Sequence, residues 1–243
     1  MKLQAALLAA MGTLCLSPAY AGPADYVYTP TVEKGEKEID FKFGTADNSP
    51  RNSAASLGFG YGANDWWFTE LYVKYAKTGS GDAKYDAVEW ENKFQLTETG
   101  KYPVDVGLIT EIEIPRDRNE EGIEVRVGPL FQTEFGKLQL NANVLFEHHF
   151  DSTESSTTET GYQWQVKYRW QTAFEYGLQG FGGTGPWNDL DDTGSQSHQA
   201  GPAVFGKFAA GDHHFIKYNA AWLFGMTNAA ADNTFRMQVE YEF

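Results

Sequence analysis

The sequence contains almost no cysteine. Its one cysteine, Cys15, lies in the apolar run 3–16, which follows Lys2 and precedes Ala19-Tyr20-Ala21. A short charged start, an apolar run and an A-x-A site are typical of a secretory signal peptide, so we predict one over residues 1–21, cut after Ala21. The exported chain would then have no cysteine and no disulfide. A closed hydrogen-bonded sheet is one other way to hold such a chain together.

Long apolar runs and an excess of basic residues are also missing. Beyond residue 21, no stretch reaches the ~18 consecutive apolar residues of a transmembrane helix. The chain has 19 Lys and Arg against 33 Asp and Glu, a formal net charge of -14. This balance disfavours nucleic-acid binding and is compatible with attraction of cations. By contrast, 17 Phe, 13 Tyr, 7 Trp and 25 Gly are abundant, which suits the aromatic girdles and tight turns of a β-barrel.

The stretch 234–243 reads TFRMQVEYEF and ends on the aromatic Phe243. Apolar residues at odd positions alternate with polar residues at even positions. Because side chains alternate between the two faces of a strand, this pattern predicts a ribbon with one apolar and one charged face. Its length matches the roughly 9–11 residues with which a tilted strand crosses a bilayer.

The same alternation recurs along the chain, separated by turn residues. About twelve strands are predicted, over residues 37–44, 54–62, 66–76, 85–97, 103–114, 123–135, 138–150, 162–170, 174–182, 198–208, 213–225 and 234–243. Long polar connections alternate with connections of two to five residues. An up-and-down barrel gives this rhythm when one rim faces the cell exterior and the other faces the periplasm.

The terminal strand and the signal-like start resemble those of bacterial outer-membrane β-barrels, in particular small porin and transporter barrels of Gram-negative bacteria. The resemblance implies an all-β fold: a single closed up-and-down antiparallel transmembrane barrel with long extracellular loops and short periplasmic turns. It also implies residence in the outer membrane, with its lipids and lipopolysaccharide as partners. Tyr241 and Phe243 would form the signal read by the barrel-assembly machinery. We divide the chain into a signal peptide (1–21), a short periplasmic segment (22–36) and the barrel (37–243).

The charged face of these strands is predicted to line the lumen. The candidate pore-lining residues are Glu70, Lys74, Glu89, Glu91, Lys93, Asp105, Glu111, Glu113, Glu124, Arg126, Glu147, Lys167, Arg169, Lys217, Arg236 and Glu240. Two interpretations stay open. The charges form a conduit for small polar solutes, with a preference for cations, or they pair into a network that fills a non-conducting barrel whose acidic loops bind a ligand.

An enzymatic function is the weaker alternative. Outer-membrane hydrolases place Ser, His and acidic residues near the outer rim, and here His148 and His149 end a strand close to Ser152. No G-x-S-x-G element is present, and the spacing of His149, Glu147 and His198 is not a metal motif. We therefore predict no catalytic residues, no metal site and no cofactor.

Overall fold

The computed structural model describes residues 22–48, 50, 52–153 and 156–243, so the predicted signal peptide lies outside the described residues. The strands are β1 (Lys37–Ala46), β2 (Asn52–Asn64), β3 (Trp67–Thr78), β4 (Lys84–Gln95), β5 (Asp105–Pro115), β6 (Ile123–Phe135), β7 (Leu138–Phe150), β8 (Glu159–Gln171), β9 (Phe174–Pro186), β10 (Ser197–Gly211), β11 (His214–Gly225) and β12 (Asn233–Glu242). A single turn of helix, α1 (Arg118–Glu121), lies between β5 and β6. Among the described residues, no helix is long and apolar enough to cross a membrane.

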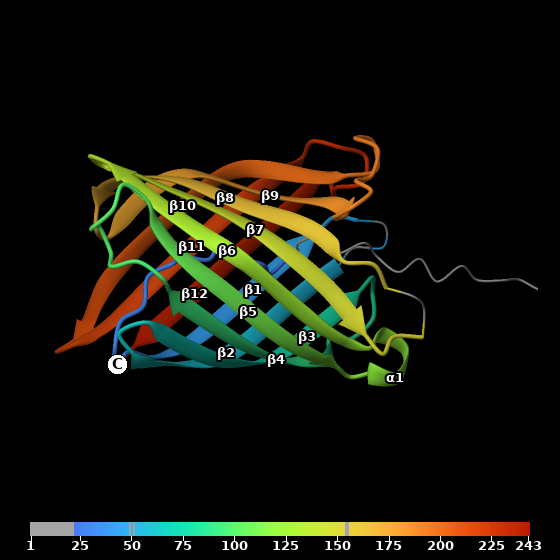
Figure 1. Ribbon diagram of the computed structural model, residues 1–243, viewed down its shortest axis with the longest axis horizontal. Helices are drawn as coiled ribbons and strands as arrows, with labels where there is room; N and C mark the ends of the chain where they lie inside the picture. The colour runs from blue at the N-terminus through green and yellow to red at the C-terminus, as the bar shows by residue number, and fades with distance from the viewer. Residues whose placement is uncertain (1–21, 49, 51, 154–155) are drawn as a thin grey trace, which may run out of the picture.

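The strands form one closed barrel in which each pairs antiparallel with its sequence neighbours (Figure 1). The first and last strands close it, in a register that runs from Glu38 opposite Glu242 to Ala46 opposite Thr234. Closure leaves no open sheet edge, so backbone N–H and C=O groups are paired even where no water can reach them. The structure confirms the predicted all-β, up-and-down barrel of twelve strands.

The two faces of the sheet are the reverse of those in a water-soluble protein. In β1, Asp40 and Lys42 are buried inside the barrel, whereas Ile39 and Phe41 are 43% and 41% exposed on the outside. The alternation that the sequence predicts is therefore charged inward and apolar outward. This is the arrangement expected for strands surrounded by lipid.

The two rims differ in their connections. The rim that carries α1 holds the longer loops, and the C-terminus lies at the opposite rim (Figure 1). At that opposite rim, two residues join β6 to β7 and β8 to β9. One connection there is longer than predicted, because residues 96–104 separate β4 from β5. Leu96 and Thr97 still hydrogen-bond to the carbonyl of Val106, which fixes the start of that loop.

The N-terminal segment, residues 22–36, does not lie in the position expected from the sequence. Instead of a periplasmic extension, the structure shows it running inside the lumen. Glu33 and Gly35 lie at the short-turn rim beside Gly62, and Pro23 lies against Gly44 of β1. The physical reason is that Val27 and Tyr28, both buried, find apolar neighbours inside the barrel.

Candidate functional site: the barrel lumen

The structure places all sixteen candidate pore-lining residues on the inward face of the barrel. Alternation along each strand explains this, because the neighbouring outward positions are apolar and exposed. Seven are buried: Glu70, Glu89, Glu91, Asp105, Glu111, Glu147 and Arg236. Their role in lining a pore stays a prediction, while their position inside the barrel is a property of the structure.

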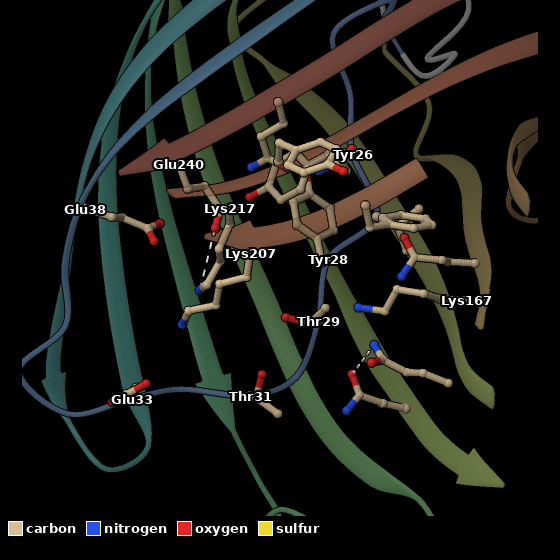
Figure 2. A pocket seen from close by; sticks show the side chains of 18 of the residues that line it. Tyr26, Tyr28, Thr29, Thr31, Glu33, Glu38, Lys167, Lys207, Lys217 and Glu240 are labelled. Atoms are coloured by element: carbon tan, nitrogen blue, oxygen red, sulfur yellow. Dashed lines mark hydrogen bonds and ion pairs between the residues drawn. The ribbon is translucent and has the colours of Figure 1, made fainter. Parts of the chain in front are cut away.

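A cavity of about 920 Å³ occupies the half of the lumen nearest the short turns (Figure 2). It reaches the rim at Glu134 and Arg169, which are partly exposed. On its inner side it is bounded by Tyr26, Val27 and Tyr28 of the N-terminal segment. We call this space the vestibule. It is large enough to hold a small hydrated solute.

Basic and acidic residues are paired along one wall of the vestibule. Lys217 of β11 lies 3.2 Å from Glu36 and 3.6 Å from Glu240, and it also contacts Glu242. Lys207 of β10 lies 2.8 Å from Glu242. Each of these lysines is therefore neutralised by carboxylates, and the wall does not present a free cationic patch.

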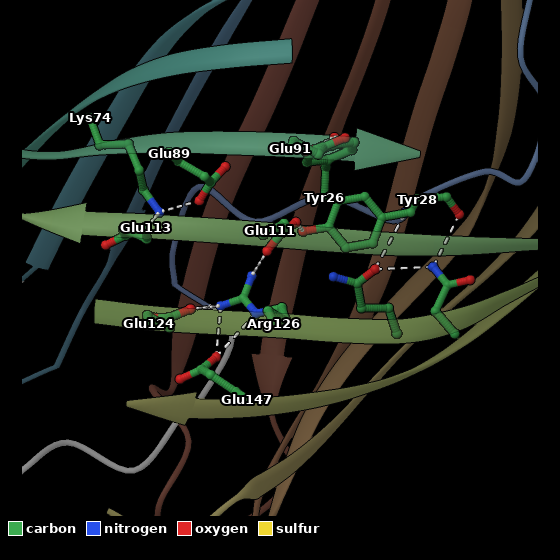
Figure 3. A network of polar contacts seen from close by, with 12 residues as sticks. Tyr26, Tyr28, Lys74, Glu89, Glu91, Glu111, Glu113, Glu124, Arg126 and Glu147 are labelled. Carbon is green, nitrogen blue, oxygen red and sulfur yellow. Dashed lines mark hydrogen bonds and ion pairs between the residues drawn. The ribbon is translucent and has the colours of Figure 1, made fainter. Parts of the chain in front are cut away.

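A charged network occupies the lumen on the β3–β7 side, from the middle of the barrel toward the long-loop rim (Figure 3). At its centre, the guanidinium of Arg126 in β6 donates to Glu111 at 2.9 Å and to Glu147 at 2.8 Å. It also lies 3.1 Å from Glu124. The planar fork of arginine lets one cation bridge carboxylates from three adjacent strands, β5, β6 and β7.

A second cation extends the network toward β3. The ammonium of Lys74 lies 2.9 Å from Glu89 and also contacts Glu113. Between the two cations, oxygens of Glu89, Glu91 and Glu111 lie within 4.8 Å of one another. Three buried carboxylates at this separation repel each other, and they need nearby donors to be stable.

The N-terminal segment supplies two of those donors. The Tyr26 hydroxyl lies 2.9 and 2.8 Å from the two carboxylate oxygens of Glu91. The Tyr28 hydroxyl donates to Glu111. Sequence reasoning missed both tyrosines, because the alternation of strands says nothing about a segment that precedes them. The stretch Tyr-Val-Tyr at residues 26–28, within the N-terminal segment, is the sequence feature that could have indicated their burial.

The neighbouring wall, formed by β12, β1 and β3, holds a smaller polar cluster that sequence reasoning also left out. Asp40 accepts hydrogen bonds from Tyr72 at 2.7 Å and from Gln238 at 2.9 Å. Lys42 lies over the Tyr26 and Tyr72 rings, 3.7 and 3.6 Å from their centroids. Inward-facing positions of β1 and β3 predict this neighbourhood, but only the folded barrel shows that Tyr26 completes it.

The histidine residues do not assemble into one site. His148 faces outward, packs on Phe150 and lies 3.2 Å from the Thr158 hydroxyl. His149 faces inward, with its Nε2 3.4 Å from Glu147. Successive residues of a strand point to opposite faces, so the two imidazoles cannot act on the same molecule.

A metal-like grouping of Glu124, Glu147 and His149 is present near the long-loop rim. However, Arg126 already donates to Glu147 and lies beside Glu124. Arg126 thus neutralises these two carboxylates through oxygens other than those nearest the His149 Nε2. His198 makes its contacts elsewhere, with Tyr162 at 2.8 Å.

Comparison with known proteins defines the class of fold. No family model and no curated protein sequence matches the chain. Among solved structures, the NanC porin superposes with a TM-score of 0.57 at 10% identity, over 85% of this chain and 100% of that one. An outer membrane channel from Pseudomonas putida F1 gives a TM-score of 0.58 at 12% identity, over 90% and 98% of the two chains. The fold is that of outer-membrane porin and channel barrels, and no closer family is assigned.

Proposed function

We propose that this protein is an outer-membrane channel for the passive passage of small polar solutes, with a preference for cations. The observation that carries the proposal is the inverted barrel. An apolar outer face encloses a charged lumen that contains a vestibule of about 920 Å³. The porin and channel barrels that share the fold support the same class of function.

The charge of the lumen supports a preference for cations. The vestibule is lined by eight acidic residues and five basic residues. The acidic residues are Glu33, Glu36, Glu38, Glu70, Glu91, Glu134, Glu175 and Glu240. The basic residues are Lys93, Lys167, Arg169, Lys207 and Lys217. Charges in a narrow cavity with low-dielectric walls raise the local concentration of counter-ions, so an acidic excess concentrates cations.

Selectivity can be measured as the reversal potential of the purified protein in planar bilayers under a potassium chloride gradient. We expect a reversal potential of the sign that indicates cation selectivity. Replacing Glu38→Gln and Glu70→Gln, which line the vestibule from β1 and β3 of the barrel wall, should move it toward zero. The matched change Lys93→Gln should move it the other way. A reversal potential that indicates anion selectivity, or one unaffected by all three changes, would contradict the proposed preference.

The filled middle of the barrel favours a second candidate, a non-conducting barrel. Arg126, Lys74 and the two tyrosines occupy the lumen between β3 and β7. The absence of conductance above background, from protein that is folded and inserted, would favour this candidate over the channel.

A further inference from the structure

The N-terminal segment fits the inside of the barrel at several points along its length. The Val32 N–H donates to the Gln95 side chain at 2.8 Å, near the short-turn rim. Deeper in the lumen, the backbone carbonyl of Tyr28 accepts a hydrogen bond from the Asn143 side chain at 3.0 Å. The backbone N–H of Tyr28 donates to the Gln163 side chain at 3.3 Å. These bonds come from β4, β7 and β8, so the segment is held from different sides.

Glycines of the barrel wall form a seat for the backbone of the segment. A Cβ atom on Gly44 would overlap the carbonyl oxygen of Pro23, and one on Gly62 would overlap that of Glu33. A Cβ atom on Gly107 would lie 2.9 Å from the Cα of Pro30. The lack of a side chain at Gly44, Gly62 and Gly107 thus leaves room for the segment at three separate levels.

Apolar side chains of the wall complete the seat. Val27 packs with inward-facing residues of β9, β10 and β11, and Tyr28 packs with Ile109, Leu130 and Leu145 of β5, β6 and β7. Inward apolar residues are out of place in a water-filled lumen, because they would be exposed to water there. Contact with the segment removes them from water.

The attachment differs from that of the strands. The described backbone contacts of residues 26–32 with the wall go to side-chain amides, whereas every strand is paired through a ladder with two neighbours. A segment without a ladder is a unit of low local stability that can detach while the rest of the fold stays intact.

The two tyrosines of the segment also cover carboxylates that line the lumen. Tyr26 and Tyr28 bond to Glu91 and Glu111, two of the three clustered carboxylates (Figure 3). A cation that crosses the lumen would use the same oxygen atoms. Occupation of these acids by neutral hydroxyl groups therefore competes directly with passage of a cation.

We propose that residues 22–34 are a tethered plug: seated, they close the lumen between the vestibule and the long-loop rim, and the channel conducts when they leave. This inference rests on the proposed channel function and names how that channel is regulated. The plug is released by loss of the contacts at Tyr26, Val27 and Tyr28, while the barrel stays folded.

The first test compares the full chain with a variant that lacks residues 22–32, in planar bilayers. We expect the deletion to raise the single-channel conductance or the open probability several-fold. A second variant guards against a folding defect. Gly44→Ala displaces Pro23 without shortening the chain, whereas Gly161→Ala, at a lumen-facing glycine with only the Gly182 oxygen at 3.3 Å, should behave as the wild type.

A reversible lock tests the same idea in the opposite direction. Pro30→Cys with Gly107→Cys places two thiols where the Pro30 Cβ and a Cβ built on Gly107 are 2.9 Å apart. In a disulfide the two Cβ atoms lie about 3.8 Å apart, so a small outward shift of the segment is enough for the bond to form. Oxidation should abolish openings, and a reducing agent should restore them. Each single cysteine variant should respond to neither treatment.

A labelling experiment separates failure of the plug from failure of the channel. Leu130→Cys lies beneath Tyr28 and is buried, so a polar thiol reagent should label it slowly in the full chain and rapidly after deletion of 22–32. Lys93→Cys, in the vestibule, should be labelled in both. Equal conductance and equal labelling of Leu130→Cys in the two forms would overturn the plug. If neither form conducts, the proposed channel function fails, and unequal labelling would still show that the segment closes the lumen.

Discussion

The central cation of the lumen offers the sharpest test of how the barrel is stabilised. Replacing Arg126→Gln removes a guanidinium that contacts three carboxylates, those of Glu111, Glu124 and Glu147. Their side chains are only 2%, 16% and 11% exposed, so water cannot replace the lost partner fully. Removal of one partner from a buried ion pair costs about 3–5 kcal/mol, mainly because the remaining charge stays buried and unpaired.

The measurement is urea unfolding of protein folded into lipid vesicles, followed by tryptophan fluorescence and extrapolated to zero denaturant. Arg126→Gln should lower the free energy of unfolding by about 3–5 kcal/mol. Lys101→Gln removes an exposed pair with Glu98 and should cost no more than about 1 kcal/mol. The double variant Arg126→Gln with Glu147→Gln should recover part of the loss, because one unpaired carboxylate is gone. A cost for Arg126→Gln as small as that for Lys101→Gln would refute the reasoning.

Two further predictions concern the outer face and the chain end. Leu71→Arg puts a charge on an outward residue in the middle of β3 that is 54% exposed, and it should destabilise the barrel by about 2–4 kcal/mol in the same urea assay. Leu96→Arg, at the rim, should cost about 0–1 kcal/mol. Equal losses of stability for Leu71→Arg and Leu96→Arg would contradict a lipid-facing β3. Deletion of Phe243, whose N–H donates to Lys37 at 2.9 Å and whose ring packs on Tyr241, should lower the amount of barrel recovered from outer membranes. Deletion variants that assemble as well as the full chain would rule out a role of this residue in assembly.

The barrel was predictable because its signal is local. Alternation at Arg236, Gln238 and Glu240 against Met237 and Val239 fixes both the strand and its two faces, and the same pattern recurs along the chain. Strand ends were less accurate: β9 continues to Pro186, four residues beyond the predicted end at 182. The glycines in that stretch hid the continuation, because they carry no side chain that could show alternation.

The interior of the barrel was predictable only in part. The charged inward residues follow from alternation, but Phe181, Phe205 and Leu223 are also inward and apolar. Period-two patterns cannot tell them from lipid-facing residues, since their partner, Val27, lies far away in sequence. The same holds for Gly44, which reads as a weak strand position until Pro23 is seen against it. Contacts between distant segments leave no periodic trace.

Because only Gly35 and Glu36 separate residues 22–34 from β1, their binding to the barrel is an intramolecular event. A short flexible link of this kind holds a ligand at an effective concentration on the order of millimolar. Contacts that would be too weak to retain a free peptide are then sufficient to keep the lumen occupied most of the time. A synthetic peptide with the sequence of this segment would have to be supplied at about the same concentration to take its place.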